Sequence, residues 1–503
     1  MTSANDDLTN DSRGETNRVG QVRPLWRDFL SRTTLHGTQY ACVTKPLIRR
    51  VTWLLLLLGM VGYFGYLFYG NLKRYHSHPV EVTVEIETPN DGIGFPAVSV
   101  CTNNKYMKSK INMLRNHSYF HKLGLDIPEC AALQNVSGNM TCGQALMCAI
   151  VGKYGYIINE RCKWALEKIR KIINDSDYAF DIEKFTLKYG HDIKALLTPR
   201  FCTFRGKPCN EEDFVPVITS TSLCWTFNSG FRGSHGNPAP RKQVTFSGVD
   251  FGLTVLLNTR VDENTIGTSS EGVRAVVHEP GEYFSVDHGV NVMPGAHAAI
   301  LVHAQKTTTL PLPYKSNCTE SKPGLRLYSM EGCVALCASQ ELTRRCGCRP
   351  VGLPYVDAAS VCSFKHETCA MDTFGSFDAQ RCMCNNACHR TMYNAKVSYA
   401  RFPDQYIIRF IQETTSYNYS AEYFRRNLVL VQVGMESLSY EHHRQVPAFP
   451  VESLLGAVGG HLGLLLGCSV LTVFEFIDFF IVALASMLRT NVTPNMDRET
   501  KNL

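Results

Sequence analysis

The sequence predicts a membrane protein in which two helical spans flank a large, disulfide-rich α+β domain. Two apolar runs lie near the ends of the 503-residue chain, at residues 51–70 and 451–488. Of the 20 cysteines, all but Cys42 and Cys468 lie between these runs. A dense, even set of cysteines confined to one segment is typical of a domain that folds in an oxidising compartment. We therefore expect residues 71–450 to lie outside the cytoplasm.

The first part of the chain, residues 1–50, is polar and contains no early apolar core. No cleavable signal peptide is predicted there, so we expect the first apolar run to act as an uncleaved signal anchor. That run carries no charge and is long enough to cross a hydrocarbon core of ~30 Å as a helix. Its glycines form a small-residue face that suits close helix packing in a membrane.

The second apolar run, residues 451–488, is longer than one simple crossing requires. Glycines interrupt it, and it also contains His461, Glu475 and Asp478. Ionisable groups inside an apolar segment should face protein or water rather than lipid. The run is therefore interpreted as a pore-lining helix with a break near its middle. The alternative is a long helix whose two carboxylates extend to the inner membrane surface.

Flanking charges predict the orientation of both spans. Lys45, Arg49 and Arg50 precede the first span, and Arg489 follows the second. Positive-inside logic places residues 1–50 and 489–503 in the cytoplasm. Six glycosylation sequons between the spans agree with this orientation, at Asn116, Asn135, Asn139, Asn174, Asn317 and Asn418. The predicted location is the plasma membrane, with lipid around both spans.

The segment between the spans holds about 380 residues, enough for a large core or several subdomains. Residues 103–175 and 322–400 are predicted to be more helical than the rest of this segment, and they carry most of the cysteines. Short β-rich runs alternate with turns elsewhere, at residues 80–86, 97–100, 244–257, 273–277, 298–304 and 428–435. Together these patterns predict an α+β domain.

Several function classes receive no support. The net charge of +6 is small and the basic residues are dispersed, which argues against nucleic-acid binding. H-E-x-x-H, G-x-S-x-G and a glycine-rich phosphate loop do not occur in the sequence, so we predict neither an enzyme nor a cofactor. No metal site is predicted.

A series of short motifs carries a resemblance to a known family. In chain order they are His36-Gly37, Phe95-Pro96-Ala97-Val98, Cys202 with Cys209, Glu212-Asp213-Phe214, Cys224-Trp225-Thr226-Phe227-Asn228-Ser229-Gly230, Pro294-Gly295, Leu312-Pro313-Tyr314, Cys333 with Cys337, Cys346-Gly347-Cys348-Arg349, Cys382-Met383-Cys384-Asn385, Leu454-Leu455-Gly456-Ala457-Val458-Gly459-Gly460 and Gly467-Cys468-Ser469. From His36 to Asp478 the chain resembles the degenerin/epithelial sodium channel/acid-sensing ion channel family, and is most similar to its acid-sensing branch.

The resemblance implies a trimer with a hand-like ectodomain of finger, thumb, palm, knuckle and β-ball regions. It also implies a sodium-preferring pore that amiloride-like compounds block. Gly467-Cys468-Ser469 matches the selectivity filter, and His36-Gly37 matches a cytoplasmic gating motif. The outer pore falls at Gly456, Ala457 and Gly460. Ala457 stands where acid-sensing members commonly have an aspartate, which puts outer-mouth divalent binding and blocker affinity in question.

Oligomerisation is required on geometric grounds as well, because two spans in one chain cannot enclose a water-filled path. Closed rotational symmetry is the usual solution. Repeated by symmetry, Glu475 and Asp478 would form acidic rings that attract cations and repel anions. The chain could form a homotrimer or combine with related subunits in a heterotrimer, and its permeant partner would be sodium.

The disulfide pairing is likewise implied by the resemblance. The implied pairs are Cys101–Cys224, Cys202–Cys209, Cys318–Cys388, Cys333–Cys384, Cys337–Cys382, Cys346–Cys369 and Cys348–Cys362. Four cysteines of the finger-like region remain: Cys130, Cys142, Cys148 and Cys162. An oxidising compartment favours two further bridges among them over free buried thiols.

The sequence does not select a single stimulus for opening the channel. Proton gating needs groups that titrate at mildly acidic pH, meaning histidines or carboxylates with raised pKa values. His76 and His78 match the family's histidine pair in part, and Asp372 and Asp378 are candidates for its acidic pocket. The alternatives are constitutive activity with block by protons or calcium, and activation by a peptide or another ligand.

Two other classes share parts of this topology. An ATP-gated two-span channel would need a lysine-rich phosphate site in the ectodomain, and no such cluster occurs. A non-conducting accessory or receptor subunit would have no use for Glu475 and Asp478 in its second span.

Overall fold

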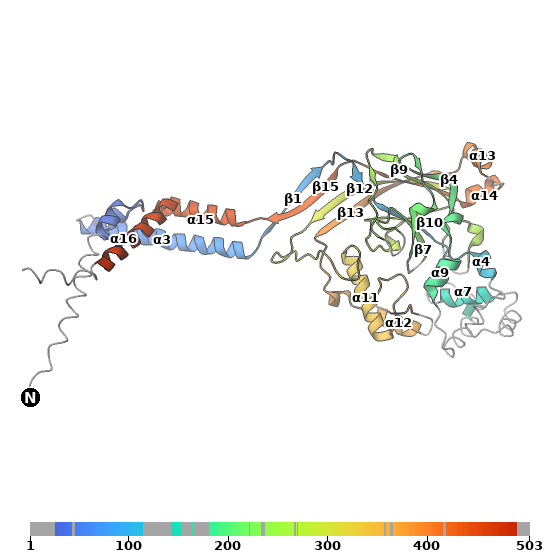
Figure 1. The fold of residues 1–503 in the computed structure, drawn as a ribbon, viewed down its shortest axis with the longest axis horizontal. Helices are drawn as coiled ribbons and strands as arrows, with labels where there is room; N and C mark the ends of the chain where they lie inside the picture. The colour runs from blue at the N-terminus through green and yellow to red at the C-terminus, as the bar shows by residue number, and fades with distance from the viewer. Residues whose placement is uncertain are drawn as a thin grey trace, which may run out of the picture. The chain divides into compact units, whose positions relative to one another are not determined.

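The computed structural model describes residues 26–42, 46–113, 142–152, 162–163, 181–220, 222–232, 237–265, 268, 270–356, 359–362, 366–415 and 419–489. The chain divides into two compact units (Figure 1). One unit comprises Met1–Glu81 with Pro447–Leu503, and the other comprises Val82–Val446. The first unit therefore joins the two ends of the chain.

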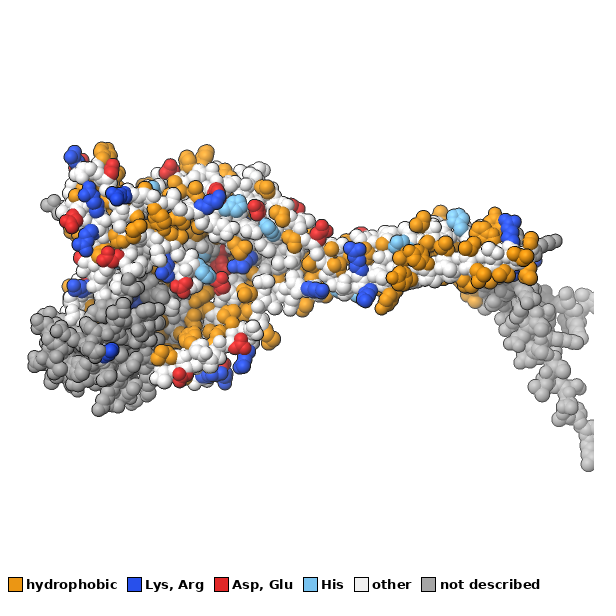
Figure 2. All heavy atoms as spheres, turned by 180° about the vertical axis from the view of Figure 1, so that it is seen from behind, with side chains coloured by type: hydrophobic (Ala, Val, Ile, Leu, Met, Phe, Trp, Pro, Cys, Tyr) orange, Lys and Arg blue, Asp and Glu red, His pale blue; other side chains and the backbone are white. Residues whose placement is uncertain are grey.

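The first unit is helical. A short helix at residues 26–32 and α2 (Thr38–Cys42) precede α3 (Leu47–His76), and α15 (Val451–Leu466) and α16 (Val470–Arg489) close the chain. α15 packs along α3 (Figure 1). Large apolar side chains on α3 and α16 are exposed, and Figure 2 shows hydrophobic patches along the visible face of this unit. An apolar exterior of this kind suits an environment other than water.

By length and composition, α3 is the one helix among the described residues that alone is long and apolar enough to cross a membrane. It contains the whole of the first predicted span. α15 and α16 meet the same test only as a pair, bent by 74° at the residues between them. The bend falls at Gly467-Cys468-Ser469, near the middle of the second predicted run.

The second unit contains two main β-sheets. The larger has the order β1-β15-β12-β14-β9-β4-β5, with β13 also paired to β12. Its strands are β1 (Val80–Glu87), β4 (Leu197–Phe204), β5 (Lys207–Pro208), β9 (Gly248–Asn258), β12 (Ala296–Thr308), β13 (His389–Arg401), β14 (Leu428–Met435) and β15 (Tyr440–Pro447). The smaller has the order β11-β10-β3-β7-β6, from β3 (Ala97–Thr102), β6 (Phe214–Ile218), β7 (Leu223–Phe227), β10 (Val273–His278) and β11 (Val290–Val292).

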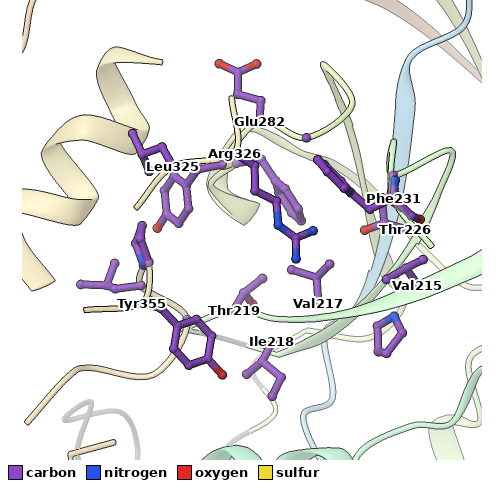
Figure 3. Close-up of a pocket in the computed structure, with 18 of the residues that line it drawn as sticks. Val215, Val217, Ile218, Thr219, Thr226, Phe231, Glu282, Leu325, Arg326 and Tyr355 are labelled. Atoms are coloured by element: carbon purple, nitrogen blue, oxygen red, sulfur yellow. Dashed lines mark hydrogen bonds between the residues drawn. The ribbon is translucent and has the colours of Figure 1, made fainter. Parts of the chain in front are cut away.

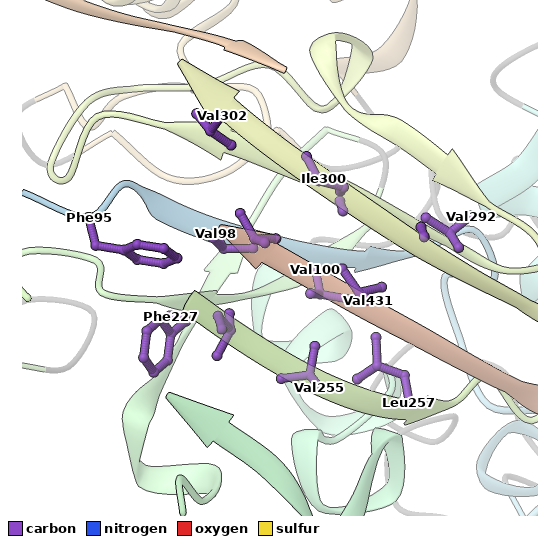
Figure 4. Close-up of a cluster of buried hydrophobic side chains, with 14 of the residues drawn as sticks. Phe95, Val98, Val100, Phe227, Val255, Leu257, Val292, Ile300, Val302 and Val431 are labelled. Atoms are coloured by element: carbon purple, nitrogen blue, oxygen red, sulfur yellow. The ribbon is translucent and has the colours of Figure 1, made fainter. Parts of the chain in front are cut away.

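A single apolar core joins the two sheets. Every second residue of β12 from Ala296 to Ala304 is buried, which is the period of a strand with one face inward. β3 is buried along its whole length, as its apolar sequence predicts. Figure 4 shows side chains of both sheets meeting in this core, among them Phe95, Val98, Val100, Phe227, Val255, Ile300 and Val431.

Short helices surround these sheets. They are α4 (Lys108–Asn112), α7 (Cys142–Gly152), α9 (Ile182–Tyr189), α10 (Ile193–Leu196), α11 (Met330–Cys346), α12 (Glu367–Gly375), α13 (Gln405–Thr414) and α14 (Ala421–Asn427). In addition, β2 (Ile93–Gly94) pairs with β8 (Gln243–Val244).

All six β-rich runs expected from the sequence coincide with strands. The helical expectation for residues 322–400 is wrong after residue 388, where β13 begins. None of its side chains is fully buried, so its extended conformation depends on pairing with β12 rather than on an apolar pattern.

Among the residues that the structure describes, eight disulfides brace the second unit. Cys101–Cys224, Cys202–Cys209, Cys318–Cys388, Cys333–Cys384, Cys337–Cys382, Cys346–Cys369 and Cys348–Cys362 are the pairs that the resemblance implies, and Cys148–Cys162 is the eighth. Cys333 and Cys337 lie one turn apart on α11, which explains why both reach the same neighbouring segment. Asn317 precedes Cys318 in a loop, whereas Cys130, Asn116, Asn135, Asn139, Asn174 and Asn418 lie outside the described residues.

Gly252 of β9 offers a test of this packing. A Cβ added there would lie 1.9 Å from the carbonyl oxygen of Val433 on β14. Because this oxygen belongs to the backbone of a paired strand, it cannot move away easily. We expect Gly252→Ala to destabilise the unit by about 3 kcal/mol or more, through overpacking. Gly375→Ala is the control and should be neutral, because its Cβ meets nothing within 4 Å. Thermal unfolding and delivery to the cell surface measure the effect of both variants. Normal stability of Gly252→Ala would contradict this packing.

Candidate functional site

The break between α15 and α16 follows from local chemistry. Gly467 ends α15 in the left-handed conformation, with φ at 65°, which glycine adopts without a steric penalty. Its N–H donates to the carbonyl oxygen of Gly463 at 3.0 Å, which forms an αL helix cap. Beyond the break, the N–H of Ser469 donates to the Thr472 hydroxyl at 3.0 Å and so starts α16. The Gly467-Cys468-Ser469 tract is thus the non-helical segment between two helices.

The N-terminal segment lies against this break. The N–H of His36 donates to the carbonyl oxygen of Leu466 at 3.1 Å. A Cβ built on Gly467 would lie only 1.7 Å from His36 Nδ1, so the imidazole occupies the space that a side chain would need. Gly37 turns the chain away with φ at 86°. The structure therefore brings His36 and Gly37, predicted as gating residues, onto the predicted filter tract.

Glu475 ties the same segment to α16. One of its carboxylate oxygens, Oε2, accepts hydrogen bonds from the Thr33 hydroxyl at 2.9 Å and from the Thr34 N–H at 3.0 Å. The Thr34 hydroxyl lies 2.6 Å from the hydroxyl of Thr472, which also starts α16. Hydrogen bonds to a carboxylate are stronger than those between neutral groups. Glu475 therefore binds a segment more than 400 residues away in sequence.

Aromatic packing extends this contact. Phe29 stacks on Phe479 with ring centroids 4.6 Å apart, and it meets Phe476 edge to face at 4.9 Å. Trp26 lies 5.0 Å from Phe479. Offset and edge-to-face pairs of this kind add to the energy of apolar burial. Residues 26–36 thus pack on α16 through apolar and polar contacts at once.

The remaining predicted pore residues have different surroundings. Asp478 is exposed on α16, whereas Glu475 is half-buried by its contacts with the N-terminal segment. Cys468 carries a free, half-buried thiol. A Cβ added at Gly456 or Gly460 meets nothing within 4 Å, so α15 presents a bare backbone strip there, next to the half-exposed Ala457.

Of the four residues proposed as proton sensors, two belong to the first unit and two to the second. His76 is the last residue of α3, and its carbonyl oxygen lies 2.9 Å from Nδ1 of His78. Asp372 is an exposed residue of α12. Asp378 caps a short 3-10 helix by accepting a hydrogen bond from the Gln380 N–H at 3.0 Å. Among the described residues, no group of three or more histidines, cysteines or carboxylates could hold a metal ion.

Sequence reasoning missed a charged cluster in the second unit. His442 Nδ1 lies 2.6 Å from a carboxylate oxygen of Glu87, and His442 Nε2 lies 2.8 Å from the Thr308 hydroxyl. Tyr440 donates a hydrogen bond to Glu87 as well. This bond and the contact with His442 hold the pKa of the Glu87 carboxyl below its usual range. Glu87 and His442 are 355 positions apart, so no local sequence signal could join them.

Over most of its length, the chain is similar to known channel proteins. The family model described as amiloride-sensitive sodium channel matches residues 29–479. Acid-sensing ion channel 2 of Homo sapiens is 29% identical over 469 residues, covering 90% of this chain and 85% of that protein. Acid-sensing ion channel 1A of Danio rerio is 29% identical over 472 residues, covering 91% and 87%. The bile acid-sensitive ion channel of Mus musculus is 28% identical over 474 residues, covering 90% and 87%.

Proposed function

The chain belongs to the amiloride-sensitive sodium channel family, and from that premise we propose that it is a subunit of a trimeric, sodium-preferring channel of the plasma membrane. The observation that carries the proposal is the contact of His36 with Gly467 at the break between α15 and α16. A non-helical tract at membrane depth is tolerated where it is enclosed by protein or lines water. An ATP-gated channel, the other candidate with two spans, receives no support from the family match.

The topology has residues 51–70 and 451–488 as spans, with both ends in the cytoplasm. Its support is the contact between residues 26–36 and α16, because a segment that precedes the first span can touch the second half of the second span only at the same membrane depth. The disulfides described above favour an extracellular position for residues 71–450, which would carry the glycans.

The pore is assigned to α15 and the tract below it. Gly456 and Gly460 give α15 a bare strip, which allows helices of three subunits to approach closely. Gly467, Cys468 and Ser469 would then present backbone carbonyl oxygens toward the axis as the filter. Asp478, exposed on α16, would form an acidic ring below it. The partner subunits would be further copies of this chain or related chains.

External protons are the gating stimulus that we propose. Relatives at 28–29% identity are named acid-sensing and bile acid-sensitive channels, so both acid and an amphipathic ligand have precedent among them. His76, His78, Asp372 and Asp378 are the proposed sensors. Constitutive activity and opening by a peptide or another ligand are the competing possibilities within the same family.

Stepping external pH from 8 to 5 in cells that express the chain alone tests this proposal. We expect an inward sodium current that acid switches on and amiloride reduces, because protonation would alter the charge of the sensors. A standing current that acid reduces would make the proton a blocker. Absence of current at every pH, from a chain shown to reach the cell surface, would contradict a self-sufficient channel and favour an accessory subunit.

A further inference from the structure

The second unit contains a cavity of about 830 Å³ that the channel function described above does not use. α9 and β6 form one side, and the loops after β10, before α11 and after α11 form the other. Figure 3 shows side chains from these segments turned toward a common space. The volume lies within the range of small-molecule sites, so the cavity has room for a drug-sized molecule.

The walls of this cavity are largely apolar. Figure 3 shows Val217 and Ile218 of β6 on one side, with Phe231 and Leu325 around them. Leu187 of α9 adds a further apolar side chain to the lining. Apolar walls supply affinity for a hydrophobic ligand, because the ligand leaves water when it binds.

Two ion pairs bring charge to the lining, and each is closed within the protein. Arg349 is fully buried and makes a two-point pair with Glu183, at 2.9 and 2.7 Å. Asp181 caps α9 and pairs with Lys184 at 3.3 Å. Because both partners of each pair are present, these residues do not need a charged ligand.

Three further ionisable groups line the cavity. The guanidinium of Arg326 lies 4.4 Å from the centre of the Phe231 ring, so it too is engaged within the protein. Burial lowers the pKa of His278 to about 4, so this imidazole is uncharged at pH 6. Burial raises the pKa of the Glu282 carboxyl to about 7, so most of this group is protonated at pH 6. Figure 3 shows this carboxyl turned away from the labelled apolar side chains.

We propose that this cavity binds an uncharged fused-ring molecule, held by apolar contact with Val217 and Ile218 on one side and with Phe231 and Leu325 around them. A charged ligand would lose its hydration there without gaining a new partner, which carries a large free-energy cost. An uncharged ring system avoids this cost and gains from apolar burial. A rigid molecule also loses less conformational freedom on binding than a flexible one.

The test uses the full chain in lipid nanodiscs at pH 6, with three probes that share one ring system. These are the neutral 1-naphthaleneacetamide, the anionic 1-naphthaleneacetate and the cationic 1-naphthalenemethylammonium, titrated by calorimetry and corrected with empty nanodiscs. We expect the amide to bind at least tenfold more tightly than either charged probe. Equal binding of all three, or a preference for the anion or the cation, would overturn the proposal.

Matched variants locate the site. Val217→Trp fills part of the cavity and should weaken binding of the amide at least tenfold, whereas Val82→Trp makes the same change at an exposed position of β1 outside the cavity and should change nothing. Leu187→Asp provides a second route if Val217→Trp fails to fold, because Leu187 is half exposed and tolerates a polar side chain. It places a carboxylate at the apolar wall and should weaken binding about tenfold.

Leu312→Asp is the control for Leu187→Asp, since Leu312 is exposed and does not line the cavity. It should leave binding of the amide unchanged. Unchanged binding in both Val217→Trp and Leu187→Asp would overturn the proposal.

The ligand site goes beyond the channel function, and the two proposals fail separately. Current recorded from the same wild-type and variant chains reports on the channel, whereas calorimetry reports on the cavity. Selective binding of the amide by a chain without current would retain the ligand site and reject the self-sufficient channel. Current without selective binding would reject the ligand site and leave the channel intact.

Discussion

Gly467→Ala should reduce the sodium current more than tenfold. The added Cβ would lie 1.7 Å from His36 Nδ1, and the residue would also be held at a φ of 65°, which costs a non-glycine residue roughly 1–2 kcal/mol. Either α15 must extend past its present end or the His36 segment must leave the break. Both changes would alter the tract assigned to the filter. Whole-cell current normalised to the amount of chain at the cell surface measures the effect.

Two further variants separate this mechanism from general damage to the helix. Gly463→Ala lies one turn earlier on α15, and its Cβ would meet only the Cys468 carbonyl oxygen at an ordinary 3.8 Å. It should retain most of the current. In the Gly467→Ala background, His36→Ala removes the clashing ring and should restore part of the current. An additive loss in the double variant would show that His36 and Gly467 do not interact as the structure places them.

Thr33→Val and Glu475→Gln should shift the pH of half-activation, or the open fraction of a constitutive channel, by the same amount and in the same direction. Each removes part of the network in which Glu475 Oε2 accepts hydrogen bonds from Thr33 and Thr34. Hydrogen bonds to a charged group contribute about 1.5–3 kcal/mol, so a change of roughly ten- to hundredfold in the open–closed equilibrium is expected. The double variant should add little to either single one, because both act on one contact.

Asp478→Asn is the matched control for this pair. Asp478 is exposed on the same helix, so its neutralisation should lower single-channel conductance and leave the gating equilibrium unchanged. If Glu475→Gln behaved like Asp478→Asn, and Thr33→Val had no effect, Glu475 would serve the permeation path rather than the N-terminal segment. Single-channel recording distinguishes the two outcomes.

Much of the architecture could be predicted from local patterns. Long apolar runs predicted α3 and the α15–α16 pair, because helix formation across an apolar layer depends mainly on composition and length. Alternating or continuous apolar residues predicted β3, β9, β10, β12 and β14, because a strand with a buried face imposes a period of two. β13 was assigned wrongly, since its pattern is weak and its partner strand decides its conformation.

The candidate site, like the fold, could be predicted from the sequence only in part. The glycine of the Gly467-Cys468-Ser469 tract and the isolated charges of the second run pointed to a break and to a functional role. From the sequence, Glu475 could be assigned only to a pore ring, because the sequence does not show which groups donate hydrogen bonds to a carboxylate in an apolar segment. The structure adds Thr33 and Thr34 as those partners.

By itself, the sequence determined the apolar segments, the cysteine-rich domain between them, most strands and, through ordered motifs, the family. These features depend on residues that are neighbours in the chain, or on the order of motifs along it. Only the tertiary structure decided that His36 lies on Gly467 and that Glu87 contacts His442. Each of these contacts joins residues that are distant in sequence, and the free energy that selects them comes from packing and charge pairing in the folded chain.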